Sequence, residues 1–305
     1  MELLLFVRAF ILSLILSLSK AFLPKLDLAG HRRSCCPLQV SISINDVATV
    51  QVKALDGTTV NVKDEIGDGT TILSCLSHFG DFNAWELTQQ YQAVQADANT
   101  KIILVGIGTV EAAQKFASDL DLQQSESITL LVDEAGALTD ALGCYKGWLA
   151  IDKAHAAKWP ATDVNPYIKL FGMIFGLGSP GTIAKVLYGY VGDKDGGAPS
   201  RKWVVDSLLL GSTKGRWPKL TEEAFEGIPA DSGLRPFELA TLRAQTGIHI
   251  VLNWSTLGPE NGDLFTRMGG TFVFCDKKCV YEYFDKGILT YADVNEVCAA
   301  AANSN

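Results

Sequence analysis

Three short apolar segments alternate with two helical patterns in the first half of the chain, and this alternation restricts the fold more than any other feature. The segments are rich in β-branched residues, as buried strands are. A chain in which strands alternate with helices of this length forms βαβ units with parallel strand pairing. The expected strands are 71–76, 101–107 and 128–132, and the expected helices run from an Asp81 cap to about residue 98 and from a Thr109 cap to residue 120.

Hairpins are expected on both sides of this unit. Each consists of two β-branched or apolar stretches joined by residues that favour turns. In the first, strands are expected at 40–44, 47–55 and 58–62, with Asp56-Gly57 as the turn. In the second, strands are expected at 271–275 and 280–285, with the three-residue turn 276–278 between them. Thr290 and Asp293 resemble a capping box, so a last helix is expected to begin there and to run to about residue 301.

The segment at about 145–234 interrupts this order and carries helical patterns of its own. Its apolar run 167–177 is too short to cross a bilayer, which takes roughly 20 residues. Arg235 opens a helix that could reach Trp254, although β-branched residues at 248–251 weaken the expectation for its second half. The whole pattern predicts an α/β, thioredoxin-like fold with a mixed central sheet, an N-terminal β-hairpin and a largely helical insertion.

The first residues have the pattern of a signal peptide. The apolar run 10–18 follows Arg8 and precedes Ser19 and Ala21 at signal-peptidase spacing, so a cleaved signal peptide is expected at 1–21. A membrane anchor is the alternative. The run is shorter than the roughly 20 apolar residues of a membrane span, which favours cleavage.

The residues around this cut resemble the bipartite plastid presequences of algae with secondary plastids. In those presequences a Phe follows the cut and begins a basic segment, and Phe22 here is followed by an excess of positive charge. Lys20 departs from the pattern, because a small residue is usual at that position. The resemblance implies a transit segment at 22–38, a folded domain at 39–305 and a plastid (chloroplast) location, with secretion as the alternative.

The charge balance excludes one class of partner. The chain of 305 residues has a formal net charge of −8, and residues 1–40 hold five basic and two acidic side chains, so the remainder has a net charge of −11. Nucleic acid binding needs a basic patch, so no nucleic acid partner is expected. The spacing of Cys275 and Cys279 is not that of a zinc finger, and Gly-x-Ser-x-Gly and P-loop motifs are absent, so no metal and no cofactor are expected.

Five stretches together resemble one known family. They are HFGDFNAWEL (78–87), LLVDEAGALTDALGC (130–144), GSPGTIAKVLYGYVGD (178–193), RPFELATLRAQ (235–245) and RMGGTFVF (267–274). In this order and spacing they look like the peroxiredoxin-like (AhpC/TSA-like) family of cyanobacteria and chloroplasts, a relative of the peroxiredoxin-like 2 proteins. The resemblance covers about 60–289 and implies a thioredoxin-like fold and a redox or antioxidant role.

The cysteine-bearing relatives carry Pro-Gly-Cys-x-x-Cys at the start of the first helix, where free backbone N–H groups and the helix dipole stabilise a thiolate. The matching loop here is Gly80, Asp81, Phe82, Asn83 and Ala84. Asp81 occupies the position of the first cysteine and Ala84 that of the second. A carboxylate can accept the same N–H groups, but it cannot attack a peroxide and be regenerated by thiol exchange. The resemblance therefore implies a degenerate active-site loop.

Two neighbouring features could contribute to this loop. His78 borders it and could donate a hydrogen bond to Asp81, or it could be an ordinary polar loop residue. Gly269, Gly270 and Thr271 stand where thioredoxins place a cis-proline that faces the active loop. Residues without Cβ atoms let the backbone approach a ligand or loop closely, so these three are expected to face the cleft, with a simple turn or bulge as the alternative.

The remaining candidates are thiols. Cys75 lies in an expected buried strand, where it would be an inert hydrophobe or, alternatively, a peroxidatic thiol. Cys144 follows a helix end, where exposure is plausible, and is the best candidate for an accessible thiol. Cys275 and Cys279 flank the hairpin turn and would form either a labile disulfide or two unpaired thiols. Cys35 and Cys36 fall in the expected transit segment, and Cys298 falls on the last helix.

Two main hypotheses for function follow. In the first, the protein is a non-peroxidatic plastid protein that binds a plastid protein or a small redox molecule at the cleft between 80–84 and 269–271. In the second, it is a thiol-dependent antioxidant oxidoreductase, a peroxidase, that uses a displaced cysteine such as Cys144 or the Cys275/Cys279 pair. A third option makes the insertion a docking surface for a membrane or complex, with 167–177 exposed rather than buried against the core.

Overall fold

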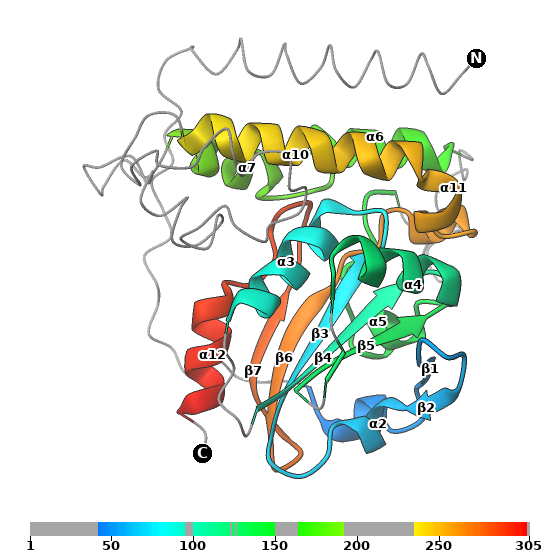
Figure 1. Cartoon of the computed structure of the whole chain (residues 1–305), viewed down its shortest axis with the longest axis vertical. Helices are drawn as coiled ribbons and strands as arrows, with labels where there is room; N and C mark the ends of the chain where they lie inside the picture. The colour runs from blue at the N-terminus through cyan, green and yellow to red at the C-terminus, as the bar shows by residue number, and fades with distance from the viewer. Residues whose placement is uncertain are drawn as a thin grey trace. The chain divides into compact units, whose positions relative to one another are not determined.

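Seven strands form one mixed sheet in the computed structural model, in the order β2-β1-β5-β4-β3-β6-β7 (Figure 1). The structure describes residues 42–94, 100–122, 124–125, 127–149, 164–191 and 235–303, all of them within one compact unit, Val40–Asn305. The strands are β1 (Gln51–Lys53), β2 (Thr59–Asn61), β3 (Thr70–His78), β4 (Thr100–Ile107), β5 (Ile128–Asp133), β6 (Gly270–Cys275) and β7 (Lys278–Phe284). The expected signal and transit segments lie outside the described residues.

The centre of this sheet has the thioredoxin topology. Strands β3 and β4 are parallel and joined through helix α3 (Phe82–Ala93), whereas β6 pairs with β3 and with β7 in antiparallel fashion. Helix α12 (Val294–Ala302) follows this hairpin. A βαβ unit beside a ββα unit, in the order β4-β3-β6-β7, defines a thioredoxin-like fold. The predicted fold class is therefore confirmed.

Successive side chains of a strand point to opposite faces of the sheet, so each central strand contributes to two hydrophobic cores, one on each face. In β3, Ile72 belongs to the core under α3, α12 and α4 (Val110–Asp119), whereas Leu73 belongs to the core on the other face. That second core is closed by the 3₁₀ helix η1 (Ile44–Val47), α2 (Val62–Glu65) and α5 (Ala137–Ala141). All nine residues of β3 are buried, as expected of a central strand covered on both faces.

Several expected elements form with their expected caps. Asp81 caps α3 and Thr109 caps α4, each accepting a hydrogen bond from a backbone N–H of the first turn. Asp56-Gly57 forms the turn between β1 and β2. Helix α3 ends at Ala93 rather than about residue 98, and residues 95–99 lie outside the described part.

Three expectations at the ends of elements were wrong. Residues 42–44 of the expected first strand 40–44 form no strand, because Ser43 and Asp46 form a capping box that begins η1 at Ile44; residues 40–41 lie outside the described part. The second hairpin turns on Asp276 and Lys277 alone, both at positive φ, so β7 begins at Lys278. Asp293 caps α12 instead of Thr290, whose hydroxyl accepts hydrogen bonds from the backbone N–H groups of residues 286 and 287.

The long helix α10 (Arg235–Leu252) is continuous, so the doubt about its second half was unfounded. Tertiary packing overrides the low helix propensity there, because Thr246 and Ile250 are buried. A buried ion pair joins this helix to α3, with Arg243 Nε and Nη2 2.6 and 3.0 Å from the two carboxylate oxygens of Glu86. The hydroxyl of Tyr291 donates a further hydrogen bond of 2.6 Å to Glu86.

Two helices of the insertion are described, α6 (Pro166–Ile174) and α7 (Thr182–Val191). The indole of Trp148 fills the space that a Cβ at Gly172 or Gly178 would need, so these glycines let α6 dock closely on it. Figure 1 shows α6, α7 and α10 grouped at one end of the sheet, away from the β1–β2 hairpin. Among the described residues, no helix is both long and apolar enough to span a membrane. The α11 turn (Trp254–Leu257) and η4 (Gly262–Leu264) lead back to β6.

Candidate functional site

The N-terminal end of α3 carries a cluster of buried polar side chains. Strand β3 ends at His78, and Asp81 takes the N-cap position with extended backbone dihedrals. One oxygen of Asp81, Oδ1, accepts a 3.4 Å hydrogen bond from the backbone N–H of Asn83. The side chain of Asp81 is only 4% exposed, so its charge is held largely out of water. The expected capping role of this carboxylate is therefore present.

Asn83 joins this helix end to the chain that follows β7. Its amide Nδ2 donates to Asp285 Oδ2 at 3.5 Å and to the carbonyl of Gly287 at 3.4 Å. Its Oδ1 accepts a 2.5 Å hydrogen bond from the N–H of Leu289. The backbone N–H of Asp285 in turn donates to the carbonyl of Gly269 at 3.1 Å. Asp285 thus connects the loop before α3 to the segment before β6.

Asp81 and Asp285 form a buried pair of carboxyl groups. Burial, and after it the negative charge of Asp81, raise the pKa of Asp285 to about 7, and the hydrogen bond from Asn83 opposes the shift. Asp81 Oδ2 and Asp285 Oδ1 are both buried and have no hydrogen-bond partner among the described residues. A like charge nearby favours the neutral form of a buried carboxyl group, here that of Asp285. Asp285 is therefore partly protonated near neutral pH.

His78, the last residue of β3, is fully buried. Its Nε2 lies 3.1 Å from the carbonyl of Phe265, which can only accept, so Nε2 carries the proton and Nδ1 does not. Its ring packs edge-on against Trp254 with the centroids 5.6 Å apart. Burial lowers the pKa of His78, although the charge of Asp81 opposes this, so the ring is neutral. Both expectations, a hydrogen bond to Asp81 and an ordinary loop residue, were wrong.

The glycines before β6 are explained by backbone packing. A Cβ on Gly269 would lie 1.8 Å from the carbonyl oxygen of Cys75, so only glycine fits against β3 here. Gly270 is similarly restricted by the carbonyl oxygen of Tyr283, at 2.8 Å. Thr271 is fully buried, with its hydroxyl 3.3 Å from that of Ser74. The close approach expected of these residues is therefore made to neighbouring strands.

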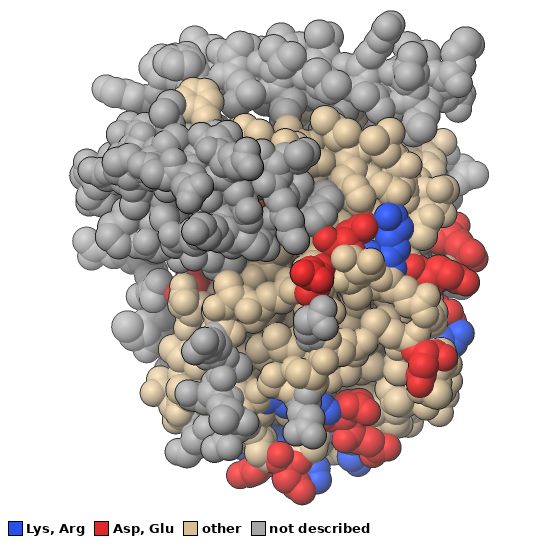
Figure 2. Space-filling view, viewed as in Figure 1, with Lys and Arg blue, Asp and Glu red and all other residues tan. Residues whose placement is uncertain are grey.

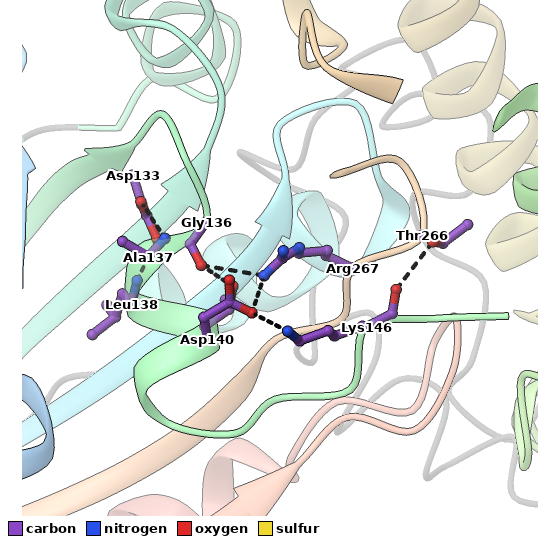
Figure 3. A network of polar contacts seen from close by, with 9 residues as sticks. Asp133, Gly136, Ala137, Leu138, Asp140, Lys146, Thr266 and Arg267 are labelled. Carbon is purple, nitrogen blue, oxygen red and sulfur yellow. Dashed lines mark hydrogen bonds and ion pairs between the residues drawn. The ribbon is translucent and has the colours of Figure 1, made fainter. Parts of the chain in front are cut away.

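A second polar network fixes the segment that enters β6 (Figure 3). Arg267 Nη1 donates to Asp140 and to the carbonyl of Gly136, and Lys146 Nζ lies 3.0 Å from Asp140 Oδ1. Burial alone would raise the pKa of Asp140, but these two cations lower it overall. Thr266 adds a 3.1 Å hydrogen bond to the carbonyl of Lys146. The network holds the segment before Gly269 in place.

The thiols closest to the site are poor nucleophiles. Cys75 and Cys144 are buried, and burial raises the pKa of both thiols well above the ordinary value. The expected exposure of Cys144 was therefore wrong. It packs with the second core, because the chain after α5 turns inward towards β3. Burial also raises the pKa of Cys279 to about 12.

The two hairpin cysteines do not oppose one another. Cys275 pairs with Lys278, and Cys279 pairs with Phe274. Successive residues of a strand point to opposite faces, so the two thiols lie on different faces of the sheet and are badly placed for a disulfide. Cys275 also lies five residues beyond Gly270, roughly 17 Å along β6 from the site. Cys298 packs partly against the first core from α12.

Asp285 is the site residue that sequence reasoning missed. It follows an edge strand at the sheet end and lies 202 positions from Asn83, so nothing local marks it. The only available signal was a carboxylate directly after an apolar strand. Within the described ranges, no group of three or more His, Cys, Asp or Glu residues could hold a metal ion. Cys35, Cys36, His31 and His155 lie outside those ranges.

Several solved structures are similar to this chain over a limited region. A secreted disulfide oxidoreductase of Mycobacterium tuberculosis, homologous to E. coli DsbE, has 17% identity and a TM-score of 0.27, over 32% of this chain and 69% of that one. A putative electron transfer protein from Aquifex aeolicus VF5 has 14% identity and a TM-score of 0.26, over 32% and 68%. A thioredoxin-like protein from Aeropyrum pernix has 17% identity and a TM-score of 0.23, over 32% and 70%.

No curated protein matches this chain. The family described as AhpC/TSA antioxidant enzyme matches residues 86–287, well over half of the chain. This match takes in most of α3, the second polar network and the β6–β7 hairpin with Asp285. It begins five residues after Asp81, so it does not include the loop at the N-terminal end of α3. The chain belongs to the AhpC/TSA antioxidant enzyme family.

Proposed function

We propose that this protein is a non-peroxidatic member of its family, from the cyanobacterial and chloroplast branch, and that it acts by binding rather than by thiol turnover. The ligand would be a plastid protein or a small redox molecule, recognised at the N-terminal end of α3, around residues 80–84. The observation that carries the proposal is the buried carboxylate pair of Asp81 and Asp285, which stands where a reactive thiol would be needed.

Peroxide reduction by a thiol requires an accessible cysteine that ionises near neutral pH. Asp81 has the helix N-terminus that would lower a thiol pKa, but a carboxylate there cannot cycle between reduced and oxidised forms. Cys75 and Cys144 are buried, and the pKa of each is raised. Both therefore remain protonated at neutral pH. The proposal follows from the combination of a lost nucleophile and unreactive substitutes.

The carboxylate pair gives the site a different chemistry. Protonated Asp285 offers one hydrogen-bond donor, and the two carboxyl groups together offer several acceptors next to the N-terminal end of α3. Such a pair favours ligands that carry N–H or O–H groups over anions, because a second negative charge near two carboxyl groups is repelled. The ligand class would therefore be a neutral or cationic hydrogen-bonding group on a protein or small molecule.

The test is peroxide consumption by the protein from Val40 to Asn305, with hydrogen peroxide or an organic hydroperoxide and a thioredoxin-type reductant. The protein is expected to show no turnover, as are Cys144→Ser and Cys275→Ser variants. An Asp81→Cys variant tests the loop itself, since it returns a thiol to the helix N-terminus. Turnover by the unchanged protein that one Cys→Ser substitution abolishes would establish the alternative, a peroxidase with a displaced cysteine.

We also propose that residues 1–38 direct the protein to a plastid. The support is the signal-like run 10–18, the motif at Ala21 and Phe22, and the basic segment after it. Residues 1–40 fused to a fluorescent protein should accumulate in the plastid of an alga that has a secondary plastid. A Phe22→Ala fusion serves as the control and is expected to stop before the plastid. Secretion of the unchanged fusion would contradict the proposal.

A further inference from the structure

The carboxyl pair of Asp81 and Asp285 is closed off from solvent. Charged side chains usually lie at the surface, as those on the face in view in Figure 2 do. Asp81 and Asp285 are instead 4% and 2% exposed, and Asn83, which contacts both, is 1% exposed. A ligand can therefore reach this pair only when a covering segment moves.

The inner cover is the loop 285–290, which lies between β7 and α12. Asn83 holds the middle of this loop, because its side chain accepts a hydrogen bond from the N–H of Leu289 and donates one to the carbonyl of Gly287. Thr290 Oγ1 accepts hydrogen bonds from two backbone N–H groups of the same loop, so the loop is braced internally. Leu289 has a φ of 62°, which is unfavourable for a residue with a Cβ, so contacts from outside the loop must hold it there.

The outer cover is a turn of the insertion, Ser179-Pro180-Gly181-Thr182, which we call the 179–182 strap. It has the features of a type II turn: Pro180 in the second position, Gly181 in the third with a φ of 91°, and a 3.2 Å hydrogen bond from the N–H of Thr182 to the carbonyl of Ser179. Pro180 and Gly181 are exposed, whereas Ser179 and Thr182 are each 1% exposed. The strap therefore has one side against solvent and the other against the protein.

The buried side of the strap contacts the loop 285–290. Ser179 Oγ accepts a 3.1 Å hydrogen bond from the N–H of Ile288, and it lies 2.6 Å from Thr182 Oγ1. A Cβ on Gly287 would overlap Ser179 Oγ, so the strap and the loop are in direct contact. A chain of contacts thus runs from the solvent-exposed side of the strap through the loop to Asn83 and the carboxyl pair.

We propose that the 179–182 strap is an autoinhibitory contact that keeps the carboxyl pair closed, and that a ligand enters when the strap lifts from the loop. The inference rests on the proposed function, because it concerns access to the same site. One hydrogen bond, from Ile288 to Ser179, joins strap and loop, and such a bond shifts an equilibrium between closed and open forms by about two- to tenfold. A ligand that binds only the open form gains apparent affinity by the factor by which the open fraction rises.

The test is labelling of carboxyl groups with a carbodiimide and glycine ethyl ester in the protein from Val40 to Asn305, the compact unit that holds every described element. Mass spectrometry of the peptides gives the rates, with exposed Asp68 as the internal reference. Asp81 and Asp285 should react far more slowly than Asp68 in the unchanged protein. Ser179→Ala removes the acceptor for Ile288 and should speed both reactions by about two- to tenfold.

Thr109→Ala is the matched control, because it also removes a hydroxyl that accepts a backbone N–H, but at the cap of α4. It should lower global stability in urea without speeding the labelling of Asp81 or Asp285. Amide hydrogen exchange adds a second readout. The N–H of Ile288 should exchange faster in Ser179→Ala only, and the N–H of Ala112 in Thr109→Ala only.

The proposal is overturned if Asp81 and Asp285 react as fast as Asp68 in the unchanged protein, because the pair would then be open. It is also overturned if Ser179→Ala leaves their labelling unchanged, or if Thr109→Ala speeds it equally, since global unfolding would then be the route of access. None of these measurements depends on peroxide turnover, so failure of the strap and failure of the proposed function give different results.

Discussion

Replacing Asp285 by Asn should make the protein more stable at alkaline pH. Folding moves the pKa of Asp285 from 3.8 to about 7, chiefly by burial and then by the charge of Asp81. A group whose pKa rises on folding stabilises the folded state below its unfolded pKa, and this contribution is lost as pH rises through the folded pKa. At about 1.4 kcal/mol per pH unit, ionising Asp285 costs about 4 kcal/mol of the free energy of unfolding. Asparagine keeps the shape of the neutral carboxyl group and avoids this cost.

The assay is urea denaturation of the unchanged protein and Asp285→Asn at pH 4, 6 and 8. The two should unfold at similar urea concentrations at pH 4. At pH 8 the free energy of unfolding of the variant should be higher by about 4 kcal/mol, which corresponds to a midpoint shift of more than about 1 M urea. Comparison at each pH removes the contributions of other ionisable groups, because they are common to both proteins.

Asp68→Asn is the control for the loss of a negative charge. Asp68 is exposed and pairs with Lys277, which lowers its pKa, so this substitution should show no gain in stability at pH 8. The reasoning would be refuted if Asp285→Asn and the unchanged protein lost stability in parallel from pH 4 to pH 8. That result would mean that Asp285 is ionised in the folded protein throughout this range.

Three further substitutions or treatments test other parts of the fold. Gly269→Ala should lower the free energy of unfolding by about 3 kcal/mol, because its Cβ would meet the carbonyl oxygen of Cys75; urea denaturation measures this. Arg243→Ala should cost about 3–5 kcal/mol by leaving Glu86 charged and buried without this partner, and thermal unfolding measures it. Cys75 and Cys144 should react with a thiol reagent only after unfolding in urea, as mass spectrometry of the labelled peptides would show.

Each of these tests has a matched comparison. Gly67→Ala has open space at the new Cβ and should be nearly neutral, so an equal loss in both glycine variants would contradict the packing argument. Arg243→Met with Glu86→Leu should recover part of the stability lost in Arg243→Ala, and no recovery would count against the uncompensated charge as the cause. Labelling of Cys144 in the native protein at the rate of a small free thiol would contradict its burial.

The sequence located the strands and helix starts that depend on local pattern. Asp81 and Thr109 were recognised as caps because a cap needs only its own side chain and the next few backbone N–H groups. The β3–β4–β5 unit was recognised because its strands are short, largely apolar and separated by helical patterns. Where local preference and tertiary packing disagreed, as in the second half of α10, packing against the core decided the structure.

The candidate site was only half visible in the sequence. The resemblance marked Asp81 and Ala84, and with them the loss of thiols at the start of α3. Asp285 could not be found in this way, because its pairing with Asp81 depends on strand β7 ending beside that helix. The same limit applies to Cys144. Its position after a helix end led us to expect an exposed thiol, but in the structure it is buried, which depends on the path of the chain after α5.

By itself, the sequence determined the order of the elements and the residue that caps α3, because both depend on side-chain periodicity and on contacts over a few residues. Tertiary structure alone decided that Asp81 and Asp285 share one buried environment and that Gly269 lies against the backbone of Cys75. The physical reason is that burial and the electrostatic energy of a side chain depend on residues brought together from distant parts of the chain.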